Sequence, residues 1–136
     1  MPRALVVVIA VCVSSLALSC GAGGVGPSQD AVLSDTELNQ FVSELDRRLT
    51  AWYGTSPLEV DALRGVVDAE VTFVAEPQTG HPYCYFSASG NVIVFDPQYK
   101  NSGCMPHEIG HWALRRAGHT GWCKFEHPGE EERSCR

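Results

Sequence analysis

Two histidines and a glutamate in the segment His107-Glu108-Ile109-Gly110-His111 have the residue types and spacing of a metal-dependent hydrolytic site. On a helix, residues four apart project from one face, one turn above the other, so both imidazoles can reach one ion. Zinc binds histidine nitrogens at about 2.0–2.1 Å. Glu108 is offset around the helix, where a carboxylate can take a proton from zinc-bound water without being a ligand.

These residues form an HExxH pattern that resembles the motif of the zincin metallopeptidases, many of which also have glycine before the second histidine. The resemblance implies a zinc-dependent peptidase, with Zn²⁺ as cofactor and a peptide or protein as substrate. It also implies that Glu108 is the catalytic base and carries the proton to the leaving amine. The expected order of elements, a helix, a sheet with a hairpin and then the motif helix, is that of a zincin N-terminal subdomain.

The third metal ligand lies outside this motif. The longer metzincin pattern fails, because Leu114 and Ala117 occupy its last two conserved positions. We expect His127 to be the third ligand, since it follows His111 by 16 residues, after the predicted helix end at Gly118 and a loop long enough to reverse direction. Other small exported HExxH proteins resemble this stretch in having a histidine-containing loop and a cysteine after the motif helix.

Two other residues remain candidates for the third ligand. His119 ranks second. A helix that continues to Gly118 ends about 10 Å beyond His111, and one further residue can hardly bring His119 back to the ion. Glu130 follows His111 by 19 residues, with 18 between them. This spacing resembles that between the corresponding ligands in one aminopeptidase group.

Substrate-contacting residues are harder to assign. Tyr83, Tyr85 or Tyr99 could polarise a substrate carbonyl, but tyrosines near a hairpin are more often packing residues, so no oxyanion residue is assigned. Residues 92–96 are a candidate edge strand for aligning an extended peptide through backbone hydrogen bonds.

The sequence around these residues predicts an α+β fold, a small zincin-like domain with a short antiparallel sheet. Ser34-Asp35-Thr36-Glu37 fits a capping box before a helix that reaches Gly54. The predicted elements that follow are a shorter helix over residues 57–64, a strand over 69–74, a hairpin of residues 83–88 and 92–96, and the motif helix over about 104–117.

The number of cysteines predicts that disulfides cross-link this domain. If Cys20 carries a lipid, four cysteines remain after it, an even number that suits two disulfides in an exported protein. Proximity favours Cys84 with Cys104 and Cys123 with Cys135, although four cysteines allow three pairings.

The N-terminus has the features of an export signal. One basic residue, Arg3, precedes a charge-free, mostly apolar run of 15 residues that is too short to cross a membrane, for which about 20 apolar residues are needed. Ala17-Leu18-Ser19-Cys20 resembles a bacterial lipobox. We therefore expect a signal peptide at 1–19, a lipid-attached flexible linker at 20–33 and the domain at 34–136, with membrane contact only through the lipid. Cleavage without acylation would give a secreted protein.

Charge and composition narrow the alternatives. The chain has 10 lysines and arginines against 16 acidic residues and no basic run, which argues against nucleic acid as a partner. The competing hypothesis is a non-catalytic envelope lipoprotein, either a degenerate zincin or a binding module with a structural metal. Structural zinc sites have four protein ligands, whereas catalytic sites keep one position open.

Overall fold

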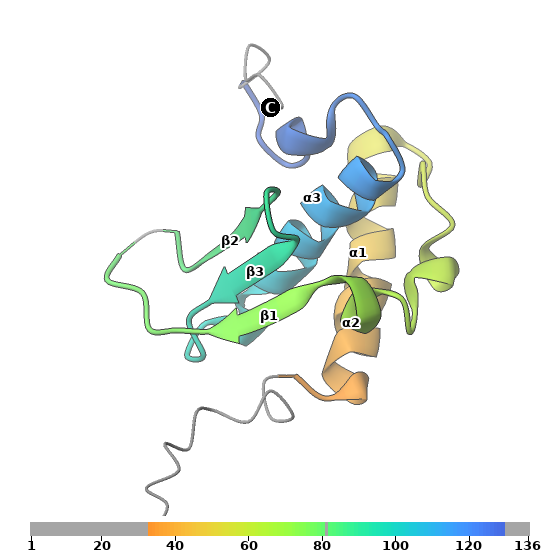
Figure 1. The fold of residues 1–136 in the computed structure, drawn as a ribbon. Helices are drawn as coiled ribbons and strands as arrows, with labels where there is room; N and C mark the ends of the chain where they lie inside the picture. The colour runs from red at the N-terminus through yellow and green to blue at the C-terminus, as the bar shows by residue number, and fades with distance from the viewer. Residues whose placement is uncertain (1–32, 81, 130–136) are drawn as a thin grey trace, which may run out of the picture.

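The computed structural model describes residues 33–80 and 82–129, and Figure 1 shows a small sheet packed against two longer helices. These residues confirm the predicted α+β class. The predicted signal peptide, Cys20, almost all of the linker, Glu130 and Cys135 lie outside the described residues. The elements in chain order are α1 (Asp35–Tyr53), η2 (Val60–Leu63), α2 (Val67–Glu70), β1 (Thr72–Ala75), β2 (Cys84–Ser87), β3 (Val92–Phe95), η3 (Lys100–Cys104), α3 (Met105–Arg116) and η4 (Trp122–Lys124).

The first helix, α1, begins and ends where its sequence predicts. Ser34 Oγ accepts the backbone N–H of Glu37 at 3.3 Å, and Glu37 Oε2 accepts the backbone N–H of Ser34 at 2.8 Å, so the capping box is formed. The helix ends at Gly54, whose φ of 82° suits glycine. Its buried face consists of five apolar residues at helical spacing: Leu38, Phe41, Val42, Leu45 and Leu49.

The sheet is mixed, with the strand order β1-β3-β2, rather than antiparallel throughout. The predicted hairpin of β2 and β3 is antiparallel, but β1 pairs with β3 in parallel. β3 is therefore the central strand, and the prediction that residues 92–96 form an edge strand is wrong. The sequence Val92-Ile93-Val94-Phe95 is apolar at every position, and its last three residues are buried, which is typical of a strand with a neighbour on each side in the sheet.

Two other predicted elements are shorter than expected. Residues 69 and 70 end α2, so the strand predicted from residue 69 begins only at Thr72. The helix expected over residues 57–64 is reduced to η2, because Ser56 holds the backbone before it in a turn. Ser56 Oγ accepts the N–H of Leu58 at 3.3 Å and donates to its carbonyl at 3.0 Å, which takes both groups from a helix.

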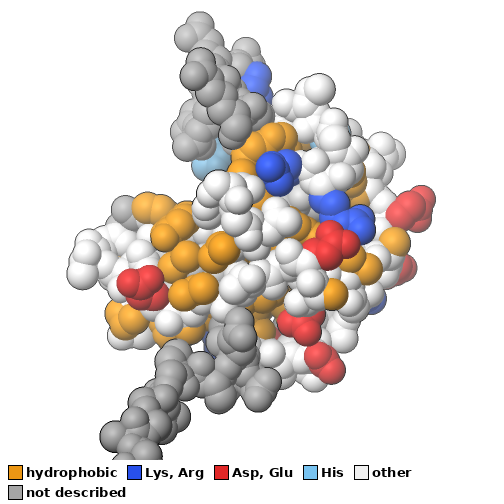
Figure 2. Space-filling model, viewed as in Figure 1, with side chains coloured by type: hydrophobic (Ala, Val, Ile, Leu, Met, Phe, Trp, Pro, Cys, Tyr) orange, Lys and Arg blue, Asp and Glu red, His pale blue; other side chains and the backbone are white. Residues whose placement is uncertain are grey.

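The two faces of the sheet have different neighbours. Phe73, Ile93 and Phe95 face α1 and α3 and belong to the buried core. The other face carries Val74 and Tyr85, which flank Val94 across the strands, and Figure 2 shows apolar side chains gathered over the sheet there. Within the described residues, no helix is both long and apolar enough to span a bilayer.

The predicted pair Cys84–Cys104 forms a disulfide. It joins β2, an edge strand of this sheet, to the residue immediately before α3. The bridge therefore ties β2 to the start of the helix that carries His107, Glu108 and His111.

Candidate metal centre

The helix α3 is buried around most of its circumference and turns its two histidines toward a cleft. Met105, Ile109 and Leu114 are fully buried and pack into the core. Pro106 lies in the first turn, where its missing N–H removes no helical hydrogen bond. His107 and His111 lie one turn apart on the side that lines the cleft, as their spacing predicts.

A third histidine, His127, joins them from the segment after the helix. His111 Nε2 lies 3.0 Å from His107 Nε2 and 3.3 Å from His127 Nε2. The ligand atoms of the three residues lie within 4.8 Å of one another, and the group can bind a metal ion. Two nitrogens at neighbouring corners of a tetrahedral zinc site, each about 2.0–2.1 Å from the ion, lie about 3.3–3.4 Å apart. The observed separations are close to that value.

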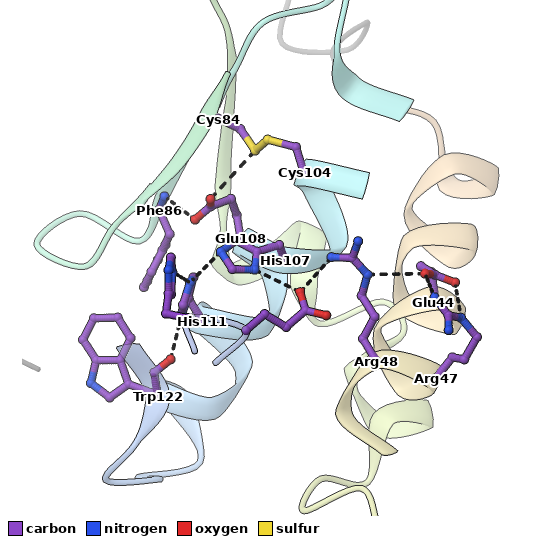
Figure 3. Close-up of polar contacts among 12 residues, drawn as sticks. Glu44, Arg47, Arg48, Cys84, Phe86, Cys104, His107, Glu108, His111 and Trp122 are labelled. Carbon is purple, nitrogen blue, oxygen red and sulfur yellow. Dashed lines mark hydrogen bonds and ion pairs between the residues drawn. A yellow bond between two sulfur atoms is a disulfide. The ribbon is translucent and has the colours of Figure 1, made fainter. Parts of the chain in front are cut away.

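The other nitrogens of the two helix histidines are held by acceptors. His111 Nδ1 lies 2.7 Å from the Trp122 carbonyl, and His107 Nδ1 lies 3.0 Å from Glu126 Oε2 (Figure 3). Because a carbonyl and a carboxylate only accept, each Nδ1 carries the hydrogen. Each neutral ring then has a lone pair on Nε2, and two lone pairs that face each other at 3.0 Å repel unless a cation lies between them. The donor set therefore fits a metal ion.

The protonation state of His107 also favours metal binding. Burial lowers the pKa of this imidazole below its ordinary value, although the adjacent Glu126 carboxylate acts in the opposite direction. A lowered pKa favours the neutral ring near pH 7, and only a neutral ring has a lone pair for a metal.

Glu108 lies beside the histidines but points to a different element. It is buried, and its Oε2 accepts the backbone N–H of Phe86 at 2.8 Å. Its Oε1 lies 3.8 Å from Cys84 Sγ, and Figure 3 shows the carboxylate turned toward β2 and the disulfide. The carboxylate is thus outside the histidine group and is held by the edge strand.

These residues line one cleft of about 720 Å³. Tyr83 and Tyr85 lie along it, and Tyr99 stacks on Tyr83 with ring centroids 3.8 Å apart. The aromatic part of the wall continues with Phe86 and Trp122, whose rings meet edge to face. The cleft thus combines a group that can bind a metal, a carboxylate and an aromatic wall.

The alternative third ligand His119 is placed elsewhere. Its ring packs on Tyr53 at a centroid distance of 5.1 Å, and its Nδ1 accepts the N–H of Gly121 at 3.2 Å. The Glu130 alternative lies outside the described residues. Cys123 is buried and disulfide-bonded. Its predicted partner Cys135 also lies outside the described residues, so that pairing stays a prediction.

Sequence reasoning missed Glu126, Arg48 and the Trp122 carbonyl. Glu126 directly precedes His127, but no spacing rule marks a residue that contacts a ligand rather than the metal. Arg48 lies on α1, and its Nη1 donates to Glu126 Oε2 at 2.9 Å. A backbone carbonyl has no sequence signature at all.

Comparison with known proteins adds nothing to this geometry: no family model, curated protein or solved structure matches the chain. The functional proposal therefore depends on the site itself.

Proposed function

We propose that this protein is a zinc-dependent metallopeptidase that holds Zn²⁺ through His107, His111 and His127. The main support is the convergence of three Nε2 atoms, two of them on rings whose Nδ1 atoms are already held by acceptors. Imidazole ligands suit zinc. Among the residues that the structure describes, this group has three possible ligands and no fourth, which suits a catalytic site with one open position.

The chain's own residues supply the remaining chemistry. Bound Zn²⁺ would polarise the substrate carbonyl and bring the pKa of a water toward about 7. Glu108 takes the proton from the attacking water and delivers it to the leaving amine. The N–H of Phe86 holds one carboxylate oxygen, so Glu108 is oriented before substrate binds. The disulfide beside it keeps β2 and α3 together.

The edge strand that would align a peptide is β2. The N–H of Asp96 donates to the Tyr83 carbonyl, which places the hydrogen-bonding groups of Tyr83 and Tyr85 toward β3. Those of Cys84 and Phe86 therefore face the opposite way, toward the cleft, as the bond from Phe86 to Glu108 shows. An extended peptide can lie along this edge through main-chain hydrogen bonds to Cys84 and to the Phe86 carbonyl, since the Phe86 N–H is bonded to Glu108.

Substitution of Glu108 tests this proposal. Glu108→Gln keeps the size of the side chain and an acceptor oxygen for Phe86, but it cannot accept the proton. Zinc content should stay unchanged, while cleavage of a mixed peptide library falls by about 10² to 10⁴. Glu70→Gln is the matched control, since Glu70 pairs with Arg116 on the surface.

Two results would contradict the proposal at different points. If the zinc-loaded, unaltered chain cleaves nothing in the library, a non-catalytic binding protein becomes the better hypothesis. If Glu108→Gln cleaves as fast as the unaltered chain, the role given to Glu108 is wrong, although the peptidase assignment survives.

The proposed location is outside the cytoplasm, with a lipid on Cys20. A disulfide between Cys84 and Cys104 supports export, because such bonds persist mainly in oxidising compartments. Metabolic labelling with a fatty acid should mark the unaltered chain and not Cys20→Ser. No label on the unaltered chain would indicate simple secretion.

A further inference from the structure

A carboxylate that is not part of the zinc-binding group connects the metal centre to α1. Glu126 Oε2 accepts from His107 Nδ1 at 3.0 Å and from Arg48 Nη1 at 2.9 Å. The side chains of Arg48, His107 and Glu126 are 20%, 18% and 26% exposed, so water screens these contacts less than it screens surface ion pairs.

Arg48 itself is held in place from two sides. Its Nε donates to Glu44 at 3.3 Å, on the same helix. On the other side, Gly103 lies so close that a Cβ there would be 2.7 Å from Arg48 Nη2. The guanidinium is thus fixed by the scaffold and can act as an anchor for Glu126.

The backbone of Glu126 is unusual for a residue with a side chain. Its φ is 56°, in the left-handed region that favours glycine. It directly follows Phe125, which is fully buried, and directly precedes His127. Backbone of this kind persists where the surroundings hold it, often at functional sites.

We propose that Glu126, held by Arg48, is a positioning residue for the metal centre. Its carboxylate keeps the hydrogen of His107 on Nδ1 and so directs the Nε2 lone pair toward the ion, and it makes the ring a better donor. Because Glu126 is also the residue before His127, its attachment to Arg48 sets where the third ligand lies. This inference rests on the metal-binding part of the proposed function and not on peptide cleavage.

Metal affinity and the visible spectrum of bound Co²⁺ test the role in the full chain. Glu126→Gln keeps an acceptor for His107 but loses the charge. Glu126→Gly loses both the acceptor and the charge. Because glycine adopts the left-handed backbone readily, this variant can be measured even if Glu126→Gln does not fold. Zinc affinity, measured by competition with a chelator, should fall by about 10- to 100-fold. The loss should be larger for Glu126→Gly, and the Co²⁺ spectrum should change in both variants.

Glu70→Gln is the matched control, because it removes a carboxylate charge of the same kind from a pair with Arg116 and has no contact with Arg48, Glu126 or His107 among the described residues. It should keep the zinc affinity and the spectrum. The inference is overturned if folded Glu126 variants bind zinc with unchanged affinity and give an unchanged Co²⁺ spectrum, even if they melt at a lower temperature, because that pattern indicates a structural role only. Failure of the unaltered chain to bind either ion is a separate result, which would refute the metal site itself.

Discussion

The candidate metal centre is built by two regions that hold their histidines in different ways. The helix α3 carries His107 and His111 at a spacing that any regular helix provides, and its other side is buried in the core. The segment after it, residues 117–129, which we call the ligand loop, supplies His127 through irregular backbone with positive φ at Glu126 and Gly129. The helix fixes its ligands by local geometry, whereas the loop must be anchored by contacts distant in sequence.

The main anchor of the ligand loop is Phe125. Its ring is fully buried and stacks on His107 at a centroid distance of 5.9 Å. The ring also lies over Gly110, where a Cβ would be 2.4 Å from Phe125 Cε1. Loop and helix therefore meet closely at the glycine inside the motif, and a side chain there would separate them.

The largest expected effect comes from removing a ligand from either region. If His127 contributes as much to zinc binding as the helix histidines do, His127→Ala should lose bound zinc as completely as His111→Ala. Metal analysis after dialysis measures this. His119→Ala is the control and should retain zinc, because His119 packs on Tyr53 instead. Full zinc retention in His127→Ala would show that the ligand loop supplies no metal ligand.

A smaller effect is expected when the contact between the two regions is changed and all ligands are kept. Gly110→Ala should destabilise the fold by about 1–3 kcal/mol, as overpacking does, because Phe125 has to move. Displacement of the ligand loop should weaken zinc binding about tenfold for each 1.4 kcal/mol of binding free energy that is lost. Thermal unfolding and chelator competition measure the two quantities.

The control for this change is Gly118→Ala. It adds a methyl group at the end of the same helix, where nothing lies within 4 Å, although the φ of 73° disfavours alanine. This variant should lose some stability and keep its zinc affinity. If both variants bind zinc as the unaltered chain does, contact between helix and loop does not govern the site.

The smallest effect is expected at the ion pair between Glu37 on α1 and Lys100 on η3, which is part of neither α3 nor the ligand loop. Hydrogen bonding to Lys100, and then to the backbone of Ser34, lowers the pKa of Glu37 from 4.5 to about 2. The stabilisation is therefore present above pH 4.5 and is lost as the pH falls toward 2.

Glu37→Gln should accordingly be less stable than the unaltered chain at pH 7, by less than about 1 kcal/mol, as for other partly exposed ion pairs. The difference should vanish near pH 2. Thermal unfolding in the presence of a chelator would show this, and Lys100→Gln should reproduce most of it. A change in zinc affinity at pH 7 would mean that the scaffold and the site are not independent.

The parts of the molecule that could be predicted are those specified by neighbouring residues. The capping box at Ser34, the hairpin and the motif helix follow from short-range patterns, and the structure has all three. The parallel pairing of β1 with β3 depends on which strands meet in space, although the doubly apolar β3 was a usable sign of a central position.

The site divides in the same way. The group of His107, His111 and His127 was predicted from the motif and from a loop long enough to return. The contact from Arg48 to Glu126 joins residues 78 positions apart and follows no periodicity. Such a contact is set by packing, here by the glycine beside Arg48 and the buried Phe125, and one sequence does not reveal it.

The Cys84–Cys104 bridge also has a consequence for the order in which the molecule matures. The two sulfurs and the Glu108 carboxylate lie within 4.8 Å of one another. As free thiolates, they would form with Glu108 a donor set that attracts a soft cation and would compete with the imidazoles for it. Oxidation removes two of these three donors. In a chain that is oxidised before it meets a metal ion, only the Glu108 carboxylate of this group remains as a donor, whereas a reduced chain could bind the ion here instead of at the histidines.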